Sequence, residues 1–169
     1  NREMKKFLGL ALVLLVATTS CKKLSSCEYS DSSATASSAE RDSLRNYLTL
    51  NSIPFQEHSS GVFYTLNSAG TGNTPDVCSQ IVVKYSGFLL NGVAPFDSYS
   101  ADGGLPMTLG RLIVGWQKGL SVVKAGGLIV LYIPPSLGYG TDPVRDGNGN
   151  TVIPANSYLK FSIELLAVN

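Results

Sequence analysis

The sequence predicts an α+β fold with an antiparallel sheet, one short helix within its strand-rich half and a further helix before that half. Runs of β-branched and aromatic residues over 62–66, 80–90, 127–133 and 158–168 predict strands. Between them, Trp116, Leu120 and Val123 recur at i, i+4 and i+7, which places them on one face of a helix. Because strands come first, then one short helix and then strands again, an antiparallel sheet is favoured over a parallel one.

The first 21 residues have the layout of an export signal. Lys5 and Lys6 precede an apolar run over residues 7–17, which is too short to span a bilayer comfortably. Small residues then lead into Cys21, and this order resembles a bacterial lipoprotein signal, in which the cysteine is acylated and becomes the new N-terminus. Because Thr18 stands where such signals usually carry leucine, ordinary signal cleavage nearby is the alternative. The lipoprotein interpretation predicts a membrane anchor at Cys21 and a location in the bacterial cell envelope, facing the periplasm or the cell surface.

Residues 22–38 are rich in serine and poor in apolar side chains, which predicts a flexible tether. Ser37 and Glu40 then have the spacing of a capping box, and Pro54 ends the helical pattern that follows. We therefore expect a helix at about 39–51, within an N-terminal unit of residues 39–60. Its apolar stripe must be buried on the domain or on a second chain, and consists of Leu44, Tyr47 and Leu48.

The two C-terminal strand segments differ in pattern. Residues 159–165 alternate between apolar and polar, as expected of a strand with one wet face, whereas residues 128–133 do not alternate. A sheet with one wet face should not expose Leu128, Val130 and Tyr132 together. We expect the apolar stripe of the N-terminal helix to cover this strand.

Composition and charge exclude several classes of function. With 44% apolar and 15% charged residues the chain can form a core. Without residues 1–21 it retains 13 − 3 = 10 basic and 12 − 1 = 11 acidic residues, so its net charge of −1 gives no reason to expect a nucleic-acid partner. His58 is the only histidine and no CxxC occurs, so neither a metal site nor a cofactor is predicted. An exported protein could join Cys27 to Cys78, but Cys27 falls in the predicted tether and both thiols stay unassigned.

Several short motifs occur in a defined order over residues 61–169. They are Val83-Lys84-Tyr85-Ser86-Gly87, Phe96-Asp97-Ser98, the stretch 109–120, and the stretches 133–140, 152–156 and 159–166. In this order they resemble an FKBP-type peptidyl-prolyl isomerase domain. The resemblance implies a half-barrel sheet wrapped around the helix that begins near Trp116. It also implies isomerase activity on proline-containing polypeptides, help in the folding of exported proteins, and binding of macrolide inhibitors.

The resemblance further implies a pocket with Trp116 as its floor. Its walls would be Tyr85, Phe96, Leu112, Ile113 and Phe161. The backbone N–H of Ile113 would bind a substrate carbonyl, Tyr139 would offer its hydroxyl, and Asp97 would place a carboxylate near the twisted amide. Leu105, Val152 and Ile153 complete the substrate-binding residues. Leu105 stands where many family members carry an aromatic wall, so the pocket is expected to be wider there.

The loop 141–151 is longer than in a minimal domain of this family, and its Gly, Asn and Asp content predicts a turn or the tip of a β-hairpin beside the site. Its acidic residues lack the terminal glutamate of an EF-hand, so a plain turn is favoured over a calcium site. Three functions stay open at this point: an isomerase, a non-catalytic chaperone or binding module for proline-containing segments, and a surface lipoprotein that uses the pocket for adhesion. Amide rotation requires no catalytic triad and no metal, so the absence of such motifs is compatible with the first.

Overall fold

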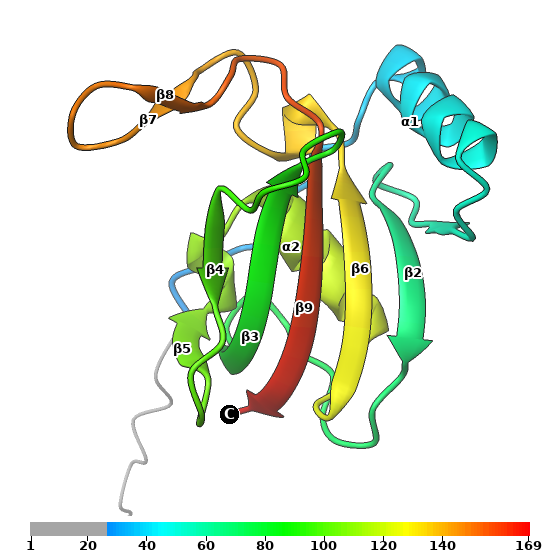
Figure 1. Ribbon diagram of the computed structural model, residues 1–169. Helices are drawn as coiled ribbons and strands as arrows, with labels where there is room; N and C mark the ends of the chain where they lie inside the picture. The colour runs from blue at the N-terminus through cyan, green and yellow to red at the C-terminus, as the bar shows by residue number, and fades with distance from the viewer. Residues whose placement is uncertain (1–26) are drawn as a thin grey trace, which may run out of the picture.

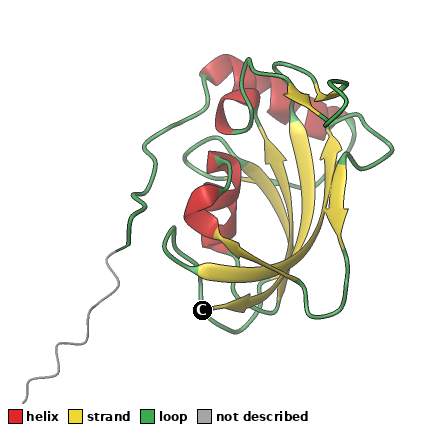
Figure 2. Ribbon diagram, turned by 90° about the vertical axis from the view of Figure 1, so that its left-hand side faces the viewer, coloured by secondary structure: helices red, strands yellow, loops and turns green. Residues whose placement is uncertain are grey.

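The computed structural model describes residues 27–169. The predicted export signal, Cys21 and the first part of the predicted tether, 22–26, lie outside the described residues. A curved antiparallel sheet wraps around one short helix, α2 (Val114–Gly119) (Figures 1 and 2). The strand order is β1 (Gln56–Glu57), β2 (Phe63–Ser68), β6 (Gly127–Ile133), β9 (Leu159–Val168), β3 (Gln80–Leu89) and β4 (Asp97–Tyr99), and β5 (Leu105–Thr108) also pairs with β3. The predicted α+β half-barrel is confirmed.

The inner face of the sheet follows the alternation expected from the sequence. On β9, Leu159, Phe161, Ile163 and Leu165 are all buried in the main core. Strand β9 lies between β6 and β3, so that Ile163 pairs with Ile129 on one side and with Tyr85 on the other. Residues that point inward from neighbouring strands thereby form one continuous apolar surface.

Helix α2 (Val114–Gly119) packs on this surface. A short 3-10 helix, η1 (Leu109–Arg111), precedes it and another, η2 (Leu120–Val122), follows it. The predicted face of Trp116, Leu120 and Val123 is buried. A Cβ added to Gly115 would lie 2.4 Å from Ile133, and one added to Gly119 would lie 2.6 Å from Leu131, so the helix backbone approaches β6 directly. A helix this short depends on such packing for its stability.

Helix α1 (Ser38–Leu50) forms a second, smaller core against the outer face of the sheet (Figure 1). The predicted capping box is present, since Ser37 and Glu40 each accept a hydrogen bond from the backbone of the other. Leu44 and Leu48 are fully buried with Phe63 and Tyr132, and Tyr47 and Val130 pack partly buried around them. The expected cover of β6 is therefore confirmed at Tyr132 and Val130. It stops short of Leu128, which is 38% exposed.

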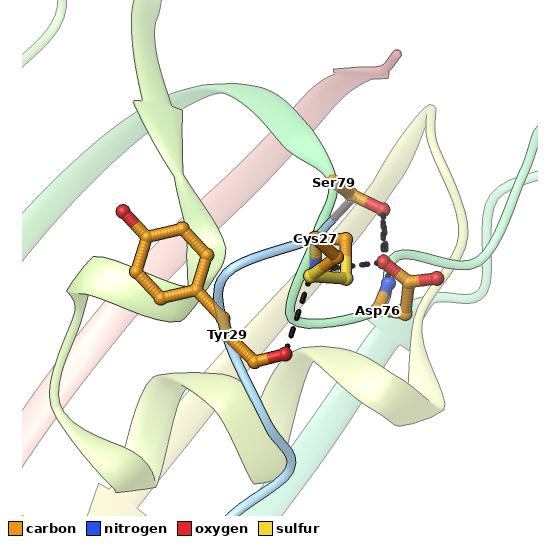
Figure 3. Close-up of a disulfide and its surroundings, with 5 residues drawn as sticks. Cys27, Tyr29, Asp76 and Ser79 are labelled. Carbon is orange, nitrogen blue, oxygen red and sulfur yellow. Dashed lines mark hydrogen bonds between the residues drawn. A yellow bond between two sulfur atoms is a disulfide. The ribbon is translucent and has the colours of Figure 1, made fainter. Parts of the chain in front are cut away.

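The prediction of a flexible tether is wrong for residues 27–37, which we call the strap. A disulfide joins Cys27 to Cys78, and Asp31 forms an ion pair of 2.7 Å with Lys118. Cys78 lies in a turn in which Asp76 accepts hydrogen bonds from the backbone N–H of Cys78 and the hydroxyl of Ser79, each 2.9 Å long. Figure 3 shows Asp76 and Ser79 beside Cys27 of the disulfide. The strap is serine-rich yet ordered, because these long-range contacts fasten it to the domain.

The long loop 141–151 forms the predicted hairpin tip. Strand β7 (Val144–Arg145) pairs with β8 (Thr151–Ile153), and the pair projects from the sheet (Figure 1). In the turn, the Asp146 carboxylate accepts hydrogen bonds of 2.9 Å from the N–H groups of Asn148 and Asn150. A third 3-10 helix, η3 (Pro135–Leu137), precedes this loop. Within residues 27–169 no helix is both long and apolar enough to cross a bilayer, and no group of three acidic, His or Cys side chains could hold a metal ion.

Candidate active site

A cavity of about 210 Å³ opens where the start of α2 meets the sheet. Strands β3, β4, β5 and β9 contribute to its wall, together with η1, the start of α2 and the loop after η3. The lining residues are Tyr85, Asp97, Met107, Arg111, Leu112, Ile113, Trp116, Tyr139 and Phe161. The fold thus brings together most of the residues expected to form the pocket, although they are spread over much of the domain sequence.

Aromatic rings form the base of the cavity. Trp116 is 4% exposed and forms T-shaped contacts with two other rings, that of Tyr85 with centroids 5.5 Å apart and that of Phe161 with centroids 5.3 Å apart. Phe96 packs edge-to-face with Phe161, with centroids 5.6 Å apart and an interplanar angle of 86°. Gly87 makes room for this stack, because a Cβ there would lie 2.5 Å from the Phe161 ring. Edge-to-face packing of this kind fixes the rings and presents an apolar surface to a ligand.

Tyr85 and Asp97 form the polar side of the cavity. The Tyr85 hydroxyl donates a hydrogen bond of 2.6 Å to Oδ2 of Asp97. Burial, and then this hydrogen bond, raise the pKa of Tyr85 well above its ordinary value. Burial and the charge of Asp97 raise the pKa of Tyr139 as well. The ordinary pKa of a phenol is already about 10, so both side chains are protonated at neutral pH, and the Tyr85 hydroxyl donates to Asp97.

The backbone at Ile113 presents a donor to the cavity. Ile113 is the N-cap of α2, and its carbonyl accepts hydrogen bonds from Trp116 and Gln117 at 2.9 and 3.3 Å. No acceptor for its N–H is found among residues 27–169. The side-chain amide of Gln117 donates to the Leu112 carbonyl at 2.8 Å and so holds the preceding peptide in place. The Ile113 N–H is thus free to bind a ligand carbonyl.

Four residues expected to contact substrate do not line the cavity. Phe96 packs against Phe161 without lining the cavity, and Leu105, although partly buried, pairs with Val83 at the sheet edge. Val152 packs partly buried against the main core, and Ile153 is 2% exposed within it. These four positions follow β-strand registers and loop paths that the sequence alone does not determine.

Two further residues line the cavity although the sequence pattern does not predict them, Met107 and Arg111. Met107 follows Leu105 by two positions on β5 and so shares its face of the strand. The alternation of β5 could have suggested Met107 as the wall in this region. The position of Arg111 depends on a partner in the strap, and no local pattern indicates that.

A half-barrel sheet around a short helix, with an aromatic cavity at the start of that helix, is the architecture of an FKBP-type isomerase domain. Residues 72–166 match the family model described as FKBP-type peptidyl-prolyl cis-trans isomerase. This match covers more than half of the chain, and the chain therefore belongs to the FKBP-type peptidyl-prolyl cis-trans isomerase family.

Individual relatives agree with this assignment. The chain is 40% identical over 110 residues to FkpA of Escherichia coli strain K12, covering 65% of this chain and 38% of that protein. It is 44% identical over 112 residues to a probable isomerase of Haemophilus influenzae, covering 65% of this chain and 44% of that protein. The crystal structure of Escherichia coli FkpA superposes with a TM-score of 0.63 and 34% identity, covering 78% of this chain and 60% of that one. The chain thus spans about half or less of the length of the curated relatives it matches.

Proposed function

We propose that this protein is a peptidyl-prolyl cis-trans isomerase that acts on proline-containing polypeptides and assists the folding of exported proteins. The observation that carries the proposal is the aromatic cavity with a free backbone donor at Ile113 and a polar side at Asp97. Rotation about an X–Pro bond is slow because resonance opposes twisting, with a barrier of about 18–20 kcal/mol. The twisted amide is less polar than the planar one, so an apolar cavity stabilises it relative to water.

The residues of the cavity have distinct roles in this mechanism. The proline ring lies on Trp116, and the Ile113 N–H orients the chain by binding a substrate carbonyl. Tyr139 donates from its hydroxyl, and Asp97, held by Tyr85, places a carboxylate beside the rotating carbonyl. No proton passes between heavy atoms in amide rotation, so no general acid or base is required.

A refolding assay limited by proline isomerisation tests the proposal. The protein should accelerate the slow phase, and a macrolide inhibitor of the family should compete for the cavity.

We expect kcat/KM to be nearly flat between about pH 6 and 8, because no group in the cavity has an ordinary pKa in that range. Asp97→Asn should slow turnover moderately, Phe96→Ala should cost more through loss of the aromatic support, and His58→Gln, outside the cavity, serves as the control. A bell-shaped profile that disappears in Asp97→Asn would assign acid–base chemistry to Asp97 and contradict the mechanism.

We further propose that the protein acts in the bacterial cell envelope and is anchored by lipid at Cys21. The export-signal pattern of residues 1–21 supports this location, and a disulfide between Cys27 and Cys78 is typical of an oxidising compartment. Cys21→Ala should move the protein from the membrane fraction to the soluble fraction, whereas Cys27→Ser should leave it anchored. Uptake of labelled fatty acid by Cys21→Ala would contradict the assignment.

A further inference from the structure

Arg111 is the positively charged residue on the cavity wall. It ends η1, and its side chain is exposed. The other charged lining residue is Asp97, whose carboxylate already accepts the hydrogen bond from Tyr85. All remaining lining residues are uncharged at neutral pH. Within the described part of the chain, Arg111 therefore supplies the cationic group that a peptide in this cavity meets.

The strap holds the Arg111 side chain in place. Nε of Arg111 donates a hydrogen bond of 2.6 Å to the Tyr29 hydroxyl. The Tyr29 ring packs over Gly110, where an added Cβ would come within 2.6 Å of the Val77 carbonyl and closer still to the ring. The disulfide fastens the strap at Cys27. Figure 3 shows that the Tyr29 ring points away from this disulfide. A guanidinium fixed in this way loses less conformational freedom when it binds a ligand.

The terminal nitrogens of Arg111 are available. Neither forms a hydrogen bond or an ion pair with any residue between 27 and 169. Glu28 lies near enough that its charge helps, after the larger effect of Tyr29, to raise the pKa of Arg111, yet it forms no ion pair with it. Glu28 lines a neighbouring hollow of about 250 Å³, which shares Arg111 with the main cavity. Two adjacent N–H donors in a planar fork match the geometry of a carboxylate.

We propose that Arg111 is a specificity-determining residue that favours substrates with an Asp or Glu side chain next to the proline, and that Tyr29 is its positioning residue. This proposal deepens the proposed isomerase function and rests on it. Ion pairs at exposed positions correspond to about 1.5- to 5-fold in affinity. Because the pair is the same in the planar and twisted states of the amide, the effect falls on KM rather than kcat.

The test uses peptides that differ only in the residue next to proline, which is Glu, Gln or Lys, placed before the proline in one series and after it in the other. Values of kcat and KM are measured for the parent protein, Arg111→Gln, Tyr29→Phe and Glu28→Gln. Arg45→Gln makes the same change of charge on α1, where Arg45 pairs with Glu57 and does not line the cavity, and serves as the matched control.

In at least one series the parent should prefer Glu over Lys by about 1.5- to 5-fold at low salt, and added salt should weaken the preference. Arg111→Gln should abolish it and Tyr29→Phe should reduce it. Glu28→Gln should increase it, because a competing negative charge is removed, and Arg45→Gln should leave it unchanged. A Glu/Lys ratio near one in both series, or a ratio that persists in Arg111→Gln, would overturn the proposal. If the parent does not isomerise even the Gln peptides, the proposed isomerase function fails instead. The Glu and Lys peptides are then compared by their binding affinity, measured through the change in Trp116 fluorescence.

Discussion

Truncation of Leu48 on α1 tests whether the N-terminal helix is an integral part of the domain. Leu48 is 0% exposed in the smaller core with Phe63 and Tyr132. Leu→Ala changes at fully buried sites cost about 2–5 kcal/mol, since apolar contact is lost and a cavity remains. A loss of about 3 kcal/mol lowers Tm by roughly 6–12 °C in a domain of this size. Leu48→Ala should therefore shift the urea midpoint clearly, with Leu50→Ala, at a position 84% exposed on the same helix, as the control.

Two probes distinguish cooperative unfolding from separate loss of α1. Trp116 is the single tryptophan and lies in the main core beneath the sheet, so its fluorescence reports on the domain rather than on α1. Far-UV circular dichroism reports on both. If α1 is integral, the two transitions of Leu48→Ala coincide and move together. A Trp116 midpoint that matches that of Leu50→Ala would refute the reasoning and show that α1 contributes nothing to the stability of the sheet.

Three further perturbations follow from the geometry. Reduction of the Cys27–Cys78 disulfide, which closes a loop with a sequence separation of 51 residues, should lower the free energy of unfolding by about 4 kcal/mol in the chain-entropy model, measured by urea denaturation with and without reductant. Glu40→Gln should lower the free energy of unfolding by up to about 1 kcal/mol, because it weakens the hydrogen bonds that the carboxylate accepts and the site is partly exposed to solvent. Partial burial alone would raise the pKa of Glu40, but hydrogen bonds from Ser136 and Ser37 outweigh it and lower the pKa below 4.5. The difference in free energy of unfolding between Glu40→Gln and the parent should therefore be present above pH 4.5. It should vanish as the pH falls through the lower pKa of the folded state. Gly87→Ala should cost about 1–3 kcal/mol and reduce isomerase activity by displacing the aromatic stack, whereas Gly147→Ala, where a Cβ meets nothing within 4 Å, should change neither.

Periodic patterns in the sequence predicted the sheet, α2 and α1 because each pattern has a local physical cause. Alternation on β9 reflects one buried face, and the i, i+4, i+7 spacing from Trp116 reflects one helix face. The capping box placed the start of α1 within one residue of the observed helix, which begins at Ser38. These features depend only on residues close to one another in the sequence, so the sequence alone is enough to predict them.

The strap and part of the cavity wall could not be predicted in this way. Serine-rich composition suggested a tether, and the ordering contacts lie far away in sequence, as with Tyr29 and Arg111, which are 82 positions apart. Such contacts leave no periodic signal. Met107 rather than Leu105 lines the wall for a similar reason, because which residue of β5 faces the cavity depends on how β5 aligns with β3. Family resemblance supplied most of the remaining site residues, and their catalytic roles stay predictions.

The N-terminal extension contacts the elements that form the cavity at two places. On one side, Tyr29 of the strap holds Arg111 on the wall. On the other, Glu40 of α1 accepts hydrogen bonds of 2.9 Å from the N–H and the hydroxyl of Ser136, within η3, shortly before Tyr139. Both contacts originate before residue 72, where the family match begins. A fragment cut to the family boundaries would retain Trp116 and Asp97 but lose Tyr29, which holds Arg111, and Glu40, which holds η3 shortly before Tyr139.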